Sequence, residues 1–195
     1  PNPKPCLISC SVLKRELQQL QAEGKLDAEL IWVCKFYHQE PAVLEKNLRK
    51  VIAHTKQKHS GKIVLVYGNL CLGQDGEMKK LADEFGIARV DAVNCIDCQL
   101  GGKGKFFESD PEHNLIFAGP GMADSFENFK FYLRTQGVDD VDAALSKIFS
   151  GIKGAVLLDT CGDGGKLEIT FKETGVPLEV LETRKIGLDN FLHVI

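Results

Sequence analysis

Short apolar segments alternate with amphipathic segments along most of the chain. Five β-branched apolar runs are each followed by turn residues and then by helix-like periodicity, and two C-terminal runs extend the series. The runs are residues 6–10, 29–34, 62–67, 87–93 and 115–121, then 153–160 and 177–183. This alternation is typical of βα units on a parallel sheet. We therefore predict an α/β fold, a Rossmann-like three-layer sandwich with a mostly parallel sheet.

Helix signals lie between these runs. Ser11 is a suitable N-cap for a segment in which Val12, Leu13, Leu17 and Leu20 recur at helical spacing. A second helix is expected from about Pro41 to Lys56, because proline suits the first turn of a helix. Further helices are expected at 77–86, 123–136, 139–150 and 166–175.

The length and composition fit one domain. A chain of 195 residues with 44% hydrophobic and 26% charged residues has enough apolar side chains for a full core. We expect residues 1–195 to form a single α/β domain. The segment 101–114, GGKGKFFESDPEHN, has the most loop-like composition and is a candidate lid or insert loop.

The charge disfavours two classes of partner. A formal net charge of -3 gives no concentrated positive surface, so we expect neither nucleic acid nor an anionic membrane as a partner. No apolar run of about 18 residues is present, and the first residues lack the pattern of a secretory signal. We expect a cytoplasmic protein.

The seven cysteines are about twice the ordinary number for this length. An odd number argues against a complete disulfide framework, and a chain this rich in core residues needs no disulfides to fold. In a reducing cytosol, these side chains are expected as thiols or as metal thiolates.

Six of the cysteines lie at, or a few residues after, the C-terminal end of a predicted strand; only Cys6 lies at a strand start. The six are Cys10, Cys34, Cys71, Cys95, Cys98 and Cys161. In an open parallel sheet, the loops beyond these strand ends share one edge, where ligands bind. The six sulfur atoms are therefore expected to face a common region.

Two interpretations of these cysteines remain open. Free cysteine is often simply a small buried apolar residue. Thiolates are also the soft ligands of iron–sulfur clusters and zinc, and nearby glycines let backbone amides approach the sulfurs. Gly68, Gly101 and Gly102 are candidates for such contacts. The recurrence at several strand ends favours the metal site.

The CxxC pair of Cys95 and Cys98 is weak evidence by itself. A redox dithiol requires an exposed thiol at the start of a helix, and the residues after Cys98 do not suggest a helix. Structural zinc sites usually take their ligands in close local pairs. Ligands from several loops fit an iron–sulfur centre better, either a [4Fe–4S] cluster or a larger one, with zinc as the alternative.

Other polar residues follow the same strand ends. His38 is a candidate nitrogen ligand or acid–base group, and Asp97 and Asp159 are candidates for proton transfer or cation binding. Surface or turn-forming roles are the alternative for each of them. The glycine-rich segment at 157–165, LLDTCGDGG, matches neither the dinucleotide-binding nor the phosphate-loop pattern.

Four segments together resemble a known family, domain of unknown function 1638 (DUF1638). CLISCSVLKREL resembles the family's strand ending in a cysteine, at Cys10. FYHQEP resembles its histidine-asparagine-x-proline turn, with Gln39 in place of the asparagine. VLVYGNLCLG and VNCIDCQLGG resemble its two further cysteine segments, placing those cysteines at Cys71 and Cys95.

The chain departs from the family pattern beside Cys95. Val93 and Asn94 replace a histidine and an aspartate, and Cys98 replaces an apolar residue. This member has therefore exchanged nitrogen and oxygen groups for sulfur. The resemblance implies an α/β fold and, since members are often encoded beside corrinoid-dependent methyl-transfer proteins of anaerobes, a role near that chemistry.

The sequence thus predicts an oxygen-sensitive metal centre with a redox or reductive-activation role and a corrinoid methyl-transfer or electron-transfer protein as partner. Cys10, Cys71, Cys95 and Cys98 are the first-choice ligands, with Cys161 and Cys34 next. Two alternatives remain: a zinc-dependent methyltransferase or hydrolase using His38 and Asp159, and a corrinoid-binding or partner-binding module with structural cysteines.

Overall fold

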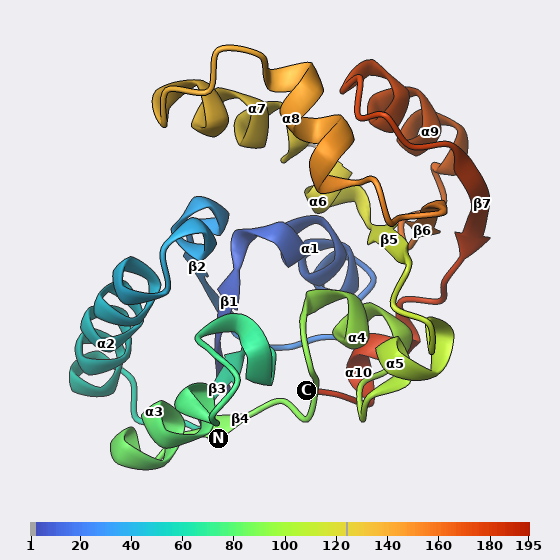
Figure 1. Ribbon diagram of the computed structural model, residues 1–195. Coiled ribbons are helices and arrows are strands. Elements are labelled where there is room, and N and C mark those ends of the chain that lie inside the picture. Colours follow the sequence, from blue (N-terminus) through green and yellow to red (C-terminus); the bar gives the residue numbers. More distant parts are fainter. Residues whose placement is uncertain (1–2, 124) are drawn as a thin grey trace. The chain divides into compact units, whose positions relative to one another are not determined.

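Within residues 3–123 and 125–195, which the computed structural model describes, seven strands form two parallel sheets (Figure 1). The first sheet has the order β2-β1-β3-β4 and the second β5-β6-β7. The strands are β1 (Cys6–Cys10), β2 (Glu29–Val33), β3 (Ile63–Val66), β4 (Ala88–Arg89), β5 (Leu115–Ala118), β6 (Gly154–Asp159) and β7 (Val180–Lys185). The predicted α/β class with parallel strands is confirmed.

Two units are distinguished by their internal contacts. The first comprises Pro1–Phe106 and Leu188–Ile195 and contains the four-stranded sheet. The second comprises Phe107–Gly187 and contains the three-stranded sheet. The sequence predicted one mostly parallel sheet, whereas the parallel strands are divided between two sheets. No helix among the described residues is long and apolar enough to cross a membrane.

In the first unit, the longest helix is amphipathic and buries one apolar face. Helix α2 buries Leu44, Leu48 and Ile52, which recur every four residues, and Pro41 begins it as expected. Helix α3 ends at Gly86, whose positive φ of 62° gives a left-handed C-cap. The helices of this unit are α1 (Lys14–Ala22), α2 (Pro41–Lys58), α3 (Glu77–Phe85), α4 (Cys95–Leu100) and α10 (Asp189–Leu192). Helix α5 (Lys105–Ser109) crosses the boundary to the second unit.

The second unit repeats the βα pattern around its own core. Its buried cluster includes Leu157 on β6 and Leu167 and Phe171 on α9. The rings of Phe126 and Phe171 pack edge to face, with their centroids 5.5 Å apart. The helices are α6 (Pro120–Ala123), α7 (Phe126–Thr135), α8 (Val141–Ile148) and α9 (Gly164–Glu173). They lie within the predicted helical segments 123–136, 139–150 and 166–175 or begin close to them; residue 124 lies outside the described residues.

The strand order of the first sheet creates a crevice. From β1, the chain crosses to β2 on one side of β1 and then returns to β3 on the other side. At such a switch point, the two crossover connections leave in opposite directions, and a crevice opens at the C-terminal ends of the central strands. Here it lies beyond Cys10 and Val66, the last residues of β1 and β3.

Three short 3-10 helices line this edge of the sheet. They are η1 (Ser11–Leu13), η2 (Lys35–Gln39) and η3 (Asn69–Cys71), and each directly follows, or follows within a few residues, the end of a strand. Each one turns the chain tightly, which keeps the residues that follow β1, β2 and β3 close to the strand ends.

The segment after β4 does not continue as a strand. A longer strand was expected at 87–93, but only Ala88 and Arg89 pair with β3. Beyond them, the carbonyls of Ala92 and Val93 accept hydrogen bonds of 2.9 and 3.0 Å from the backbone amides of Asn69 and Leu70. The backbone of this segment is therefore bonded to the loop that follows β3.

Gly68 permits that contact. A side-chain carbon on Gly68 would lie less than 3.0 Å from the backbone of Val93 and Asn94, a distance that real Cβ atoms essentially never show. Its φ of -73° is ordinary. The requirement for glycine here is therefore space between two backbones, not an unusual conformation.

We predict that Gly68→Ala lowers the free energy of unfolding by about 1–3 kcal/mol, because the added methyl group must push apart two hydrogen-bonded loops. Denaturant unfolding of the purified variant measures this loss. Gly165→Ala, in α9 with open space around the new methyl group, is the matched control and should leave stability equal or slightly higher. Equal stabilities for both variants would contradict the close approach.

Candidate metal centre

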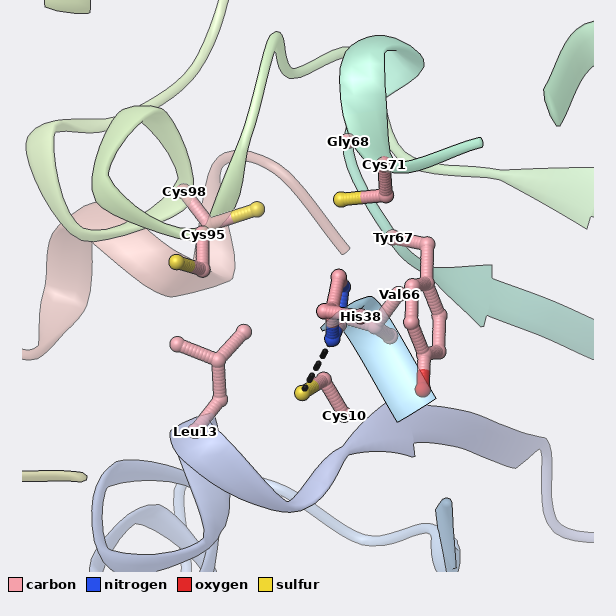
Figure 2. A pocket seen from close by; sticks show the side chains of 9 residues that line it. All are labelled: Cys10, Leu13, His38, Val66, Tyr67, Gly68, Cys71, Cys95 and Cys98. Carbon is pink, nitrogen blue, oxygen red and sulfur yellow. Dashed lines mark hydrogen bonds between the residues drawn. The ribbon is translucent and has the colours of Figure 1, made fainter. Parts of the chain in front are cut away.

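A small pocket at the crevice brings together the four first-choice cysteines (Figure 2). The space around these side chains, part of it open to solvent, amounts to about 200 Å³. The lining residues are Cys10, Leu13, His38, Val66, Tyr67, Gly68, Cys71, Cys95 and Cys98. All nine belong to the first unit, so the pocket is formed by one packed body.

Three different elements supply the sulfur atoms. Cys10 is the last residue of β1, and its sulfur accepts a hydrogen bond of 3.5 Å from the Val12 amide, which caps η1. Cys71 ends η3 after β3. Cys95 and Cys98 lie one turn apart on α4. The expectation that strand ends would gather distant cysteines is met for these four.

Helix α4 was not expected from the sequence. The CxxC pair begins a helix because Asn94 acts as its N-cap: the Asn94 side-chain oxygen accepts a hydrogen bond of 2.8 Å from the Asp97 amide. Gly101 ends the helix with a positive φ of 102°. The prediction of no helix after Cys98 was therefore wrong. The helix is short because its N-cap, Asn94, and its C-cap, Gly101, are only a few residues apart.

The Asp97 carboxylate bonds to backbone amides and does not line the pocket. It is fully buried, and its carboxylate accepts hydrogen bonds of 2.8, 3.0 and 2.9 Å from the amides of Val93, Gly104 and Phe106. Three amide donors occupy most of the hydrogen-bond acceptor sites of this carboxylate. The structure thus gives the candidate acid–base residue a loop-organising position.

Gly101 and Gly102 also lie outside the pocket lining. The Gly102 amide bonds to the Asp97 carbonyl at 2.7 Å, and a side-chain carbon on Gly102 would collide with the Asp91 carbonyl. These two glycines let the chain turn at the end of α4. Of the three candidate glycines, only Gly68 lies at the pocket.

Burial keeps the pocket thiols protonated. It raises the pKa of Cys10 from the ordinary 9.0 to about 12, although the Val12 amide partly offsets this shift. Burial likewise raises the pKa of Cys71 to about 11 and those of Cys95 and Cys98 further. Cys71 and Cys95 are half-buried as whole residues, yet burial is still the main cause of the shift of each thiol.

The thiols also affect each other. After burial, the pKa of Cys95 is raised most by the charges of Cys71 and Cys10, and that of Cys98 by the charge of Cys71. Interactions of this kind fall off with distance, so the four groups share one region. In the absence of a cation, a second thiolate beside the first would be strongly disfavoured.

His38 lies against Cys10. Its Nδ1 atom is 3.7 Å from the Cys10 sulfur and 3.2 Å from the Lys35 carbonyl oxygen. A carbonyl can only accept, so Nδ1 carries the hydrogen and donates it. Burial lowers the His38 pKa, although the Lys35 carbonyl opposes the shift. The neutral ring therefore leaves Nε2 unprotonated, which is the form that binds metals.

Tyr67 was missed by the sequence analysis. It directly follows β3, is 2% exposed, and its hydroxyl has no hydrogen-bond partner among the described residues. Leaving such a group unpaired costs about 1–3 kcal/mol. The Cys10 and Tyr67 side chains are close enough to alter each other's pKa, but they do not make a geometrically good hydrogen bond. Burial is the main cause of the raised Tyr67 pKa.

A buried polar pair behind Cys95 was also missed. Glu16 on α1 and Gln99 on α4 are buried, and the Gln99 amide donates a hydrogen bond of 2.9 Å to the Glu16 carboxylate. Glu16 adds to the raised pKa of Cys95, after burial and the neighbouring thiols. The only sequence signal was an acid among the apolar positions of a helix, which is too common to single out.

The other candidates are placed elsewhere. Cys34 follows β2, near Tyr67, but does not line the pocket. Cys161 and Asp159 belong to the second unit, where the Asp159 carboxylate accepts hydrogen bonds of 2.7 and 2.9 Å from the amides of Gly162 and Asp163. Asp159 thus organises a turn after β6. Cys6 is buried at the start of β1, at the other end of that strand.

The pocket side chains are close without being arranged as a finished ligand set. Throughout residues 3–123 and 125–195, no three cysteine, histidine or carboxylate side chains stand ready to hold a metal ion. In Figure 2, the Cys71 and Cys98 sulfurs point toward each other, whereas Cys95 is turned to the side and Cys10 lies beyond His38. Metal binding would require the cysteines to change rotamer, which moves sulfur while the backbone stays in place.

The raised thiol pKa values predict that the metal-free protein loses stability in alkali. A thiol with a raised folded-state pKa favours folding below its unfolded pKa, near 9, and this contribution is lost as the pH rises toward about 12. Cys10→Ser removes one such thiol. Between pH 9 and about 12, the free energy of unfolding of this variant, relative to that of the original protein, should therefore increase by about 1.4 kcal/mol per pH unit.

Thermal and denaturant unfolding between pH 7 and 11, with reductant and chelator present, measures this difference. Lysine side chains lose their protons in both proteins over this range, so their effect on stability cancels in the comparison. A constant difference across the range would show that the Cys10 thiol is not buried as described.

Comparison with known proteins gives one match. No curated protein and no solved structure matches the chain, but the family model described as Protein of unknown function (DUF1638) matches residues 32–192. The matched range includes Cys71, Cys95 and Cys98 and begins after Cys10. Since it covers most of the 195 residues, the chain belongs to the DUF1638 family.

Proposed function

We propose that this protein binds a metal centre, an iron–sulfur cluster by first choice, through Cys10, Cys71, Cys95 and Cys98. The observation that carries the proposal is the convergence of four cysteines from three separate elements on one pocket. The pocket lies at the switch point of a parallel sheet, where ligands of such folds bind. Cysteines that serve only as buried apolar residues would have no reason to line the same pocket.

The chemistry of the donors fits this guest. Four thiolates are the complete ligand set of a [4Fe–4S] or [2Fe–2S] cluster. The apolar side chains of Leu13 and Val66 line the same pocket. The close mutual influence of the thiols also fits, because only a cation makes several neighbouring thiolates stable together.

The proposed role is electron transfer or reductive activation, serving a corrinoid methyl-transfer system. Its support is the donor set, together with the fact that members of the family are often encoded beside such systems. When bound, a cluster would supply one-electron redox chemistry. The chain would hold the cluster, keep water away from it and supply hydrogen-bond donors to its sulfur ligands.

Zinc is the second candidate because four cysteines, two of them a CxxC pair, also form a tetrahedral zinc site. A zinc enzyme using both His38 and Asp159 has less support. His38 lies at the pocket of the first unit, whereas Asp159 is committed to a turn of the second.

We expect the protein, purified without oxygen and reconstituted with iron and sulfide, to show broad visible absorption that bleaches with dithionite. Cys71→Ser and Cys98→Ser should each lose most of the bound iron, because each removes one of four ligands. Cys6→Ala, which removes a buried sulfur from the opposite end of β1, is the matched control and should retain it.

Analysis of iron, sulfide and zinc on the same samples distinguishes the candidates. Stoichiometric zinc in a colourless protein would replace the cluster with a zinc site at the same cysteines. Metal content that is equal in the control and in the Cys71 and Cys98 variants would rule out the pocket as the metal centre.

A further inference from the structure

The Tyr67 hydroxyl is a buried donor without an acceptor. Tyr67 is almost fully buried, lines the cysteine pocket, and makes no hydrogen bond through its hydroxyl among the described residues. Proteins rarely leave such a group unpaired, and exceptions often mark a ligand or a change of state. The question is which acceptor this hydroxyl serves.

Among the pocket thiols, that of Cys10 affects the pKa of Tyr67 most, after burial, so its sulfur is the candidate acceptor. Figure 2 shows the Tyr67 hydroxyl at the same end of the pocket as Cys10, whose sulfur is turned toward His38 in the metal-free protein. A protonated thiol is a weak acceptor, so the hydroxyl gains little from it. A metal-bound thiolate carries negative charge and accepts a much stronger, charge-assisted hydrogen bond.

Two other donors already surround this sulfur. The Val12 amide donates to it at 3.5 Å, and His38 Nδ1, which donates to the Lys35 carbonyl, lies 3.7 Å from it. A backbone amide and a histidine ring nitrogen thus both lie close to the Cys10 sulfur. A thiolate at Cys10 would find several donors already in place.

The His38 ring also restrains Tyr67. The two rings stack with centroids 5.6 Å apart and planes inclined by 20°. This contact packs against one face of the phenol and so limits displacement of the Tyr67 side chain. Side chains held in this way lose little freedom when the hydrogen bond forms.

We propose that the Tyr67 hydroxyl donates a hydrogen bond to the Cys10 thiolate of the metal-loaded protein and, with His38, tunes the metal centre. Tyr67 is in this proposal a positioning residue, acting through Cys10 rather than on the metal. The inference rests on the proposed metal site. Donors to ligand sulfurs stabilise the more negative, reduced state of a cluster and so raise its reduction potential.

Tyr67→Phe tests this proposal, with Co²⁺ as the probe for thiolate ligands. The variant should bind Co²⁺ about tenfold more weakly than the original protein, the lower end of the usual effect for outer-shell partners. Its thiolate-to-cobalt absorption should move to longer wavelength, because an unbonded thiolate gives up its electrons more readily. The iron-loaded form should show a lower midpoint potential.

Two comparisons separate tuning from folding. In the metal-free state, Tyr67→Phe should be as stable as the original protein or more stable, because it removes an unpaired buried hydroxyl. Tyr132→Phe, in α7 of the second unit, is the matched control and should change neither affinity nor spectrum.

The outcomes are distinguishable. Binding of Co²⁺ and iron by the original protein, with an unchanged spectrum, affinity and midpoint potential in Tyr67→Phe, would overturn this inference and leave the metal site intact. An original protein that takes up neither metal would overturn the metal site and the inference with it.

Discussion

Two backbone hydrogen bonds between neighbouring loops hold the candidate site together. The amides of Asn69 and Leu70, after β3, donate to the carbonyls of Ala92 and Val93, after β4. The Arg89 side chain reinforces this join by donating to the Asn69 side chain. Because the join precedes both Cys71 and Cys95, it brings two cysteines that are distant in sequence to one edge of the sheet. Gly68 allows the backbones to come close enough for it.

Burial and charge then act against each other within the pocket. Burial makes each thiol a good apolar core residue as long as it is protonated, and the raised pKa values of Cys10 and Cys71 show the cost of ionising it. The same enclosure would strengthen the attraction between thiolates and a cation. The metal-free pocket thus favours four neutral thiols, and the proposed metal would favour the thiolates instead; separate thiolates without a metal are disfavoured. The unpaired Tyr67 hydroxyl is explained more readily by the metal-bound form.

Much of the fold could be predicted from residue patterns, and part of the site could as well. Apolar runs and helical periodicity located the strands, and the rule that parallel strands end at one edge brought Cys10, Cys71, Cys95 and Cys98 together. The remainder depends on contacts that no local pattern records. Asp97 seemed a candidate for chemistry because it lies beside the cysteines, but its three amide partners come from positions 93, 104 and 106. The division into two sheets likewise depends on which strands pair, and pairing is not encoded within any single strand segment.

Strand order also explains why a cysteine after a strand end is insufficient for a place in the pocket. Cys10 ends the central strand β1, and Cys71 follows its neighbour β3, so both lie at the switch point. Cys34 follows β2, on the other side of β1, where η2 turns His38 rather than Cys34 toward the pocket. Cys95 follows the short outer strand β4 and reaches the pocket only because its loop is bonded back to the loop after β3. Whether a cysteine reaches the pocket therefore depends on the position of its strand within the sheet and on the direction in which the following loop leaves. Neither can be read from the cysteine itself.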